Sequence, residues 1–95
     1  MFEFDVKKFQ LKNGYICYIM NFVEAVAIFN GLGICDECCK HEYIGFYVPV
    51  LNRYMCEECF YDWANRCKFY EEDLWFEKQN IEYVEERIKI LSMKK

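Results

Sequence analysis

Four cysteines near the middle of the chain form two close pairs with the spacing of a metal site. The pairs are Cys35/Cys38 and Cys56/Cys59, in the pattern C-x2-C-x17-C-x2-C. A two-residue gap lets both sulfurs of a pair face one ion, and four thiolates complete a closed tetrahedral shell. Because thiolates are soft ligands, they select Zn²⁺ or iron over Mg²⁺ and Ca²⁺. We therefore expect these four residues to bind one structural Zn²⁺.

Other uses of these thiols are compatible with the same spacing. The alternatives are four buried cysteines without a metal, a rubredoxin-like iron site and a redox dithiol. Cys39 or His41 could also replace Cys38 as a ligand, although the side chains of adjacent residues diverge. The two remaining cysteines, Cys17 and Cys67, lie in apolar or helical surroundings, where the expected role is that of a small buried hydrophobic residue.

Strand and turn patterns precede the first cysteine pair. Apolar and acidic residues alternate over residues 2–6, which predicts a strand. The sequence LKNG (11–14) is typical of a hairpin turn, because Asn-Gly tolerates positive φ. Residues 15–20 are rich in aromatic and β-branched side chains, which predicts a second strand covered on both faces.

A short apolar helix is expected between this hairpin and the first cysteine pair. Asn21 can cap its start, and Glu24 follows three residues later, as in a capping box. The helix would run over residues 22–30, and the sequence NGLG (30–33) would end it.

The segment between the two cysteine pairs predicts a second hairpin. Residues 45–55 are strand-like on both sides of residues 51–53. Pro49 cannot donate a ladder hydrogen bond, so its strand is expected at an edge of the sheet. After Cys56 the apolar residues recur at helical spacing, which places the second cysteine pair at the start of a helix. The stripe consists of Cys59, Phe60, Trp63, Cys67 and Tyr70.

The remainder of the chain predicts a connection and a terminal helix. Residues 71–76 are expected to form an extended connection. We expect one α+β domain over residues 1–95, divided into a hairpin and helix (1–33), a zinc module (34–70) and a connection with a terminal helix (71–95). The stripe of the terminal helix consists of Ile81, Val84, Ile88 and Leu91.

Composition and charge exclude several classes of protein. The chain is 55% apolar and carries a net charge of −4, which argues against disorder and against a non-specific nucleic-acid binder. Residues 15–34 have the length of a membrane helix, but they include Glu24 and two asparagines, which are costly in lipid. The N-terminus lacks the features of a signal peptide. We expect a cytoplasmic protein without a membrane partner, in which paired cysteines indicate metal or redox chemistry.

Catalytic patterns are not recognisable in the sequence. A shell of four cysteines leaves no open position for a metal-bound water. His41 is the single histidine and lies close to Cys39, but no oxyanion or glycine-rich feature accompanies this pair. Phosphate-binding and dinucleotide-binding motifs are also missing. We therefore expect that the protein is not an enzyme.

Two resemblances follow from the cysteine region. A cysteine knuckle, a hairpin and a cysteine pair that opens a helix resemble a treble-clef zinc finger over residues 34–70. The segment YVPVLNRYMCEECFYDW (47–63) is similar to small uncharacterised zinc proteins of Gram-positive bacteria and their mobile elements. The first resemblance implies a structural zinc, and neither implies an activity, because treble clefs serve many unrelated roles.

Function is expected to lie on the protein surface. Ten acidic residues fall between Glu57 and Glu86, against three basic ones. We expect a protein-protein interaction module or inhibitor, in one version a mobile-element protein that blocks the basic channel of a host nucleic-acid enzyme. The alternative is a zinc-finger transcriptional regulator that binds nucleic acid. The candidate aromatic contacts, of which Trp63 is the one expected to be buried instead, are Tyr47, Tyr54, Tyr61, Trp63 and Trp75.

Overall fold

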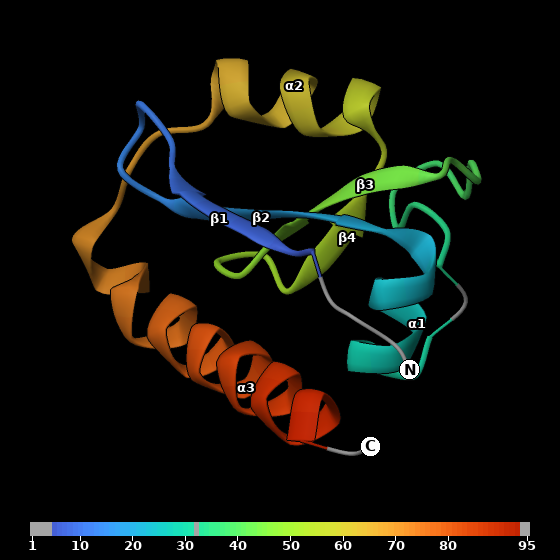
Figure 1. The fold of residues 1–95 in the computed structure, drawn as a ribbon. Coiled ribbons are helices and arrows are strands. Elements are labelled where there is room, and N and C mark those ends of the chain that lie inside the picture. Colours follow the sequence, from blue (N-terminus) through green and yellow to red (C-terminus); the bar gives the residue numbers. More distant parts are fainter. Residues whose placement is uncertain (1–4, 32, 94–95) are drawn as a thin grey trace.

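The computed structural model describes residues 5–31 and 33–93, which form a four-stranded antiparallel sheet with helices on both faces (Figure 1). The strands lie in the order of the sequence and are β1 (Lys7–Gln10), β2 (Ile16–Asn21), β3 (Ile44–Val48) and β4 (Arg53–Met55). The helices are α1 (Phe22–Phe29), α2 (Glu57–Arg66), the 3₁₀ turn η1 (Glu71–Asp73) and α3 (Leu74–Met93). The α+β class expected from the sequence is confirmed.

The first hairpin forms around the predicted turn, but its first strand lies later than expected. The Gly14 amide donates to the Leu11 carbonyl at 3.0 Å, and Gly14 has a φ of 103°, which favours glycine. This turn places Gln10 opposite Ile16, so the strand that pairs with β2 must directly precede the turn. Of the strand predicted over residues 2–6, residues 2–4 lie outside the described residues, and Asp5 and Val6 lie before β1 and not in a strand.

The predicted capping box begins helix α1. The Asn21 side chain accepts from the Glu24 amide at 2.8 Å, and the Glu24 carboxylate accepts from the Asn21 amide at 2.9 Å. Asn30 ends the helix with a φ of 58°. Residues 15–34 thus contain a strand and an eight-residue helix. Of the helices in the described part of the chain, none has the length and apolar character needed to cross a membrane.

The prediction that the Pro49 strand is an edge is wrong. Strand β3 lies inside the sheet between β2 and β4, and Pro49 follows its last residue. Because Pro49 lies in the turn after β3, its missing N–H removes no ladder hydrogen bond. The turn is closed by the Asn52 amide, which donates to the Val48 carbonyl at 2.8 Å. The edge strand on this side is β4, which leads directly into Cys56.

Strand β3 divides its side chains between two apolar cores. Successive strand residues point to opposite faces, so Phe46 and Val48 face α2 whereas Tyr47 faces α1 and α3. On the α2 side the ring of Phe60 stacks on Phe46, with centroids 4.3 Å apart. On the other side Val84 of α3 is fully buried. The sheet thus lies between α2 on one face and α3 on the other (Figure 1).

The terminal helix is longer than predicted. Its expected apolar stripe is confirmed, because Val84 is buried and Ile81, Ile88 and Leu91 pack beside it. The extended connection predicted over residues 71–76 is wrong: η1 and the start of α3 occupy it. The stripe predicted after Cys56 is also too long, because α2 ends at Arg66.

Candidate metal centre

The four predicted ligands lie together in the structure. The Sγ atoms of Cys35, Cys38, Cys56 and Cys59 all lie within 4.8 Å of one another. Those of Cys38 and Cys56 are 3.7 Å apart, close to the edge of about 3.8 Å of a tetrahedron with Zn–S bonds of about 2.3 Å. A disulfide would bring the two sulfurs to about 2.05 Å. This group could hold one metal ion.

The first cysteine pair lies on a tight turn over residues 35–40, here called the knuckle. The Cys39 amide donates to the Cys35 carbonyl at 2.9 Å, and the Cys35 amide donates to the Lys40 carbonyl at 2.9 Å. The Glu37 amide points at the Cys35 sulfur, 3.4 Å away. The turn therefore wraps around one thiol and leaves Cys38 on its exposed side.

The second cysteine pair lies at the start of helix α2. Cys56 is the N-cap residue, and its carbonyl accepts from the Phe60 amide at 2.9 Å. Cys59 follows in the first turn, so both sulfurs lie near the positive end of the helix dipole, which favours thiolates. Phe60, only 2% exposed, holds this end of α2 against the sheet.

Asp36 attaches the knuckle to the edge strand β4. Its amide donates to the Tyr54 carbonyl at 2.8 Å, and its Oδ2 accepts from the Tyr54 amide at 2.9 Å. An ion pair between Arg53 and Glu37 lies beside these bonds. Because β4 continues into Cys56, this attachment sets the position of one cysteine pair relative to the other. The cysteine pattern of the sequence does not single out Asp36, although a short acidic side chain in a turn is a typical acceptor for backbone amides.

The pKa values of Cys35 and Cys59 depend on how their neighbours are arranged. Burial raises the pKa of Cys35, but hydrogen bonds from the backbone amides of Cys56, Cys38 and Glu37 outweigh it and lower this pKa to about 7. Burial and the neighbouring thiols raise the pKa of Cys59. A thiolate at Cys35 therefore opposes ionisation of Cys59, and a bound cation would remove this repulsion.

The other candidate ligands lie outside the group of four. Cys39 is exposed and has a φ of 64°, and His41 packs edge-on against Phe22 with centroids 4.7 Å apart. Cys17 is fully buried, and burial raises its pKa to about 12, as expected for a core thiol. Cys67 is half-buried after the end of α2.

Two of the aromatic side chains expected at the surface are buried. Tyr47 is 2% exposed and Tyr54 is 8% exposed, because they lie opposite each other across β3 and β4 in the core beneath α1 and α3. Gly45 makes room for the second ring, since a Cβ there would lie 2.3 Å from Tyr54 Cζ. Tyr61 and Trp75 are exposed, and Trp63, which was expected to be buried, is half-buried.

The acidic residues do not form one continuous surface. Glu77 is buried and accepts from the Ile16 amide at 2.7 Å. Glu85 accepts from the Tyr18 hydroxyl at 2.7 Å, and Asp73 is held by Tyr15. The acids of α2 and those of α3 lie on helices that cover opposite faces of the sheet (Figure 1). The exposed acids are therefore divided among separate regions.

Comparison with protein-family models, with curated proteins and with solved structures finds no match for this chain. The two resemblances drawn from the cysteine region therefore remain predictions.

Proposed function

We propose that the protein is a zinc-binding interaction module with a structural, treble-clef-like site. The closely grouped sulfurs of Cys35, Cys38, Cys56 and Cys59 support this assignment. Four thiolates favour Zn²⁺ over harder ions and leave no open position for a reacting water. The order of knuckle, β3–β4 hairpin and α2 is that of a treble clef. Metal analysis of the purified protein should find about one zinc per chain.

The binding surface that we propose is the acidic aromatic segment, residues 69–75 (FYEEDLW), which joins α2 to α3. Its large side chains are unusually exposed: 40% for Phe69, 51% for Tyr70, 38% for Leu74 and 68% for Trp75. Exposed clusters of this kind mark interaction sites, and Trp and Tyr are the side chains most often found at the centre of an interface. This exposure is the observation that carries the proposal.

The acidic aromatic segment is held in one conformation before any partner binds. The Tyr15 hydroxyl accepts from the Tyr70 amide at 2.9 Å and donates to Asp73 Oδ2 at 3.1 Å. The ring of Phe69 packs on Tyr15 at a centroid distance of 4.9 Å. It also covers Gly14, where a Cβ would lie 2.9 Å from the Phe69 ring. A preorganised surface loses less conformational entropy when it binds.

A partner with a basic surface fits this segment best. Glu71 and Glu72 are exposed beside the aromatic side chains, and residues 69–77 contain no lysine or arginine. Charge complementarity would speed association and select against acidic partners. In its most specific version, the partner is a nucleic-acid enzyme whose basic channel receives these carboxylates, and the protein acts as its inhibitor. The resemblance to mobile-element proteins agrees with this version.

The test is capture of a partner with tagged, zinc-loaded protein, followed by rebinding of the purified partner. Trp75→Ala should weaken rebinding at least about tenfold, because truncation of a central aromatic commonly costs more than about 1.4 kcal/mol. Glu71→Gln with Glu72→Gln should slow association and reduce its dependence on salt. The matched control is Glu82→Gln with Glu86→Gln, two exposed acids further along α3. The proposal fails if Trp75→Ala and the control pair bind alike.

A further inference from the structure

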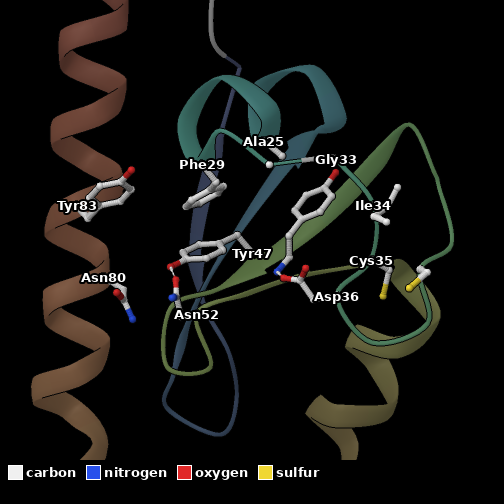
Figure 2. A pocket seen from close by; sticks show the side chains of 13 residues that line it. Ala25, Phe29, Gly33, Ile34, Cys35, Asp36, Tyr47, Asn52, Asn80 and Tyr83 are labelled. Carbon is white, nitrogen blue, oxygen red and sulfur yellow. Dashed lines mark hydrogen bonds between the residues drawn. The ribbon is translucent and has the colours of Figure 1, made fainter.

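A cavity of about 650 Å³ lies on the side of the sheet opposite α2 (Figure 2). It opens between α1, α3 and the β3–β4 hairpin, and the knuckle borders it through Cys35 and Asp36. Its volume falls within the range of about 300–1,000 Å³ that is usual for small-molecule sites. The acidic aromatic segment contributes none of its lining residues.

Three aromatic rings form one wall of this cavity. Phe29 of α1 lies 4.3 Å from Tyr47 and 6.4 Å from Tyr83 of α3, measured between ring centroids. The planes of Phe29 and Tyr83 differ by 23°. Tyr83 is 49% exposed, so part of its ring is accessible to a bound molecule. Such a wall favours a flat ring that can stack on it.

Two amide side chains add polar groups that the protein uses only in part. The Tyr47 hydroxyl donates to Asn52 Oδ1 at 2.7 Å, which leaves the Asn52 NH₂ as a donor. Asn80 Nδ2 donates to the Pro49 carbonyl at 2.8 Å, which leaves Asn80 Oδ1 as an acceptor. The two amides come from the hairpin turn and from α3, on neighbouring sides of the cavity (Figure 2).

A third polar group lines the same cavity. Tyr54 is 92% buried, and its hydroxyl has no hydrogen-bond partner within the part of the chain that the structure describes. A buried hydroxyl without a partner is uncommon and requires an explanation, such as a water or a ligand. The nearby carboxylate of Asp36 accepts from the Tyr54 amide, not from this hydroxyl. The hydroxyl is therefore available to a bound molecule.

The charge of the lining narrows the class of ligand. Among the described lining residues there is no lysine, arginine or histidine, and Asp36 is the single carboxylate. An anionic group such as a phosphate would therefore meet no countercharge in the cavity. A neutral molecule with a flat ring can stack on the aromatic wall. A donor and an acceptor on that ring can pair with Asn80 Oδ1 and the Asn52 NH₂.

From this arrangement we infer that the cavity is a binding site for a neutral, flat heteroaromatic ligand of the nucleobase or nucleoside class. The ring stacks on the aromatic wall of Phe29 and Tyr83. Its donor and acceptor edge meets Asn80 Oδ1 and the Asn52 NH₂. The inference is independent of partner binding by the acidic aromatic segment.

The test is titration of the zinc-loaded protein with adenosine, guanosine, cytidine and uridine, followed by NMR of the Asn80 side-chain amide and the Tyr83 ring. At least one nucleoside should shift both signals and bind with a Kd below about 1 mM. The 5′-monophosphate of the nucleoside that binds should bind at least about tenfold more weakly than the nucleoside itself, because the cavity has no basic group. If no nucleoside shifts these signals, or if the monophosphate binds as tightly as the nucleoside, the inference is wrong.

Variants separate this site from the rest of the surface. Tyr83→Ala should weaken nucleoside binding at least about tenfold, whereas Tyr83→Phe should retain it, because stacking depends on the ring. Asn52→Gly should also weaken binding: Asn52 has a φ of 55°, which glycine tolerates, so the turn is kept while the amide is lost. Tyr43→Ala removes an exposed tyrosine outside the cavity, so it is the matched control and should bind normally. Equal binding by Tyr83→Ala and Tyr43→Ala would overturn the inference.

Discussion

At the scale of single residues, the seven cysteines occupy different environments. Cys35 and Cys56 are buried and belong to the group of four that could hold a metal ion, whereas Cys17 is equally buried but lies outside it. Cys39 is exposed directly beside Cys38. Burial alone therefore does not distinguish the four clustered cysteines from the others; the convergence of sulfurs from two segments does.

Serine substitutions should distinguish the ligands from the other cysteines. Cys56→Ser should lose most of the zinc, because a hydroxyl replaces a thiolate at the N-cap of α2. Cys17→Ser should keep about one zinc per chain, although a buried hydroxyl costs about 1–3 kcal/mol of the free energy of unfolding.

Cys39→Ser is the exposed control in this series and should also keep its zinc. Metal content, measured on gel-filtered protein, checks all three variants. Loss of zinc from Cys39→Ser or Cys17→Ser, with zinc retained in Cys56→Ser, would show that the ligand set is wrong.

At the scale of elements, the position of the two cysteine pairs depends on contact between the knuckle and β4. Asp36 joins the knuckle to the edge strand by two hydrogen bonds to Tyr54. Its amide donates to the Tyr54 carbonyl, and its side-chain Oδ2 accepts from the Tyr54 amide, which would otherwise be unpaired. Helix α1 is attached to α3 in a comparable way, because the Arg87 guanidinium donates to the carbonyls of Ala27 and Ile28 at 3.0 and 3.2 Å. In both cases a side chain satisfies backbone groups of another element.

Removal of the Asp36 side chain should loosen the knuckle. Asp36→Ala leaves the Tyr54 amide without its acceptor, so we expect a loss of about 1 kcal/mol in the free energy of unfolding and faster hydrogen exchange at that amide. Chemical denaturation and exchange measured by NMR check this. Asp62→Ala is the control, because Asp62 forms an exposed ion pair with Arg66 and should change stability by less than about 0.5 kcal/mol. Equal effects of the two substitutions would contradict the role of Asp36.

At the scale of the whole molecule, one thin sheet supports two apolar cores. The core beneath α2 includes Cys35 and Cys56, whereas the core beneath α1 and α3 contains none of the four clustered cysteines. Each core is small, and a metal that joins the knuckle to α2 would add folding free energy on one side. Both cores share the strands, so a change on one side affects the stability of the other.

Removal of the metal should therefore lower the stability of the entire domain. A ligand present at 100 times its Kd stabilises the folded state by about 2.7 kcal/mol, so a strong chelator should lower the Tm by about 10 °C or more. Scanning calorimetry with chelator, and again after excess zinc is added, measures the shift and its reversal. Cys56→Ser is the control and should not respond to chelator. An unchanged Tm in the unmodified protein would refute a structural role for the metal.

Local patterns in the sequence determined the features that depend on neighbouring residues. The cysteine spacing predicted the group of four, Asn21 and Glu24 predicted the start of α1, and the terminal apolar stripe predicted the buried face of α3. The Asn-Gly turn predicted the first hairpin. The cap, the turn and the apolar stripe each depend on residues close in sequence or on helical periodicity. The group of four joins two segments, but within each segment the two cysteines are three residues apart.

Tertiary structure alone decided which faces are covered. Tyr47 and Tyr54 are buried because α1 and α3 pack on their side of the sheet, which no strand pattern encodes. The turn at η1 forms because the Tyr15 hydroxyl, 55 residues from Tyr70, binds its backbone amide. The cavity and the exposed segment 69–75 likewise result from the positions of distant elements. Their burial and exposure depend on contacts across the chain, which sequence periodicity does not specify.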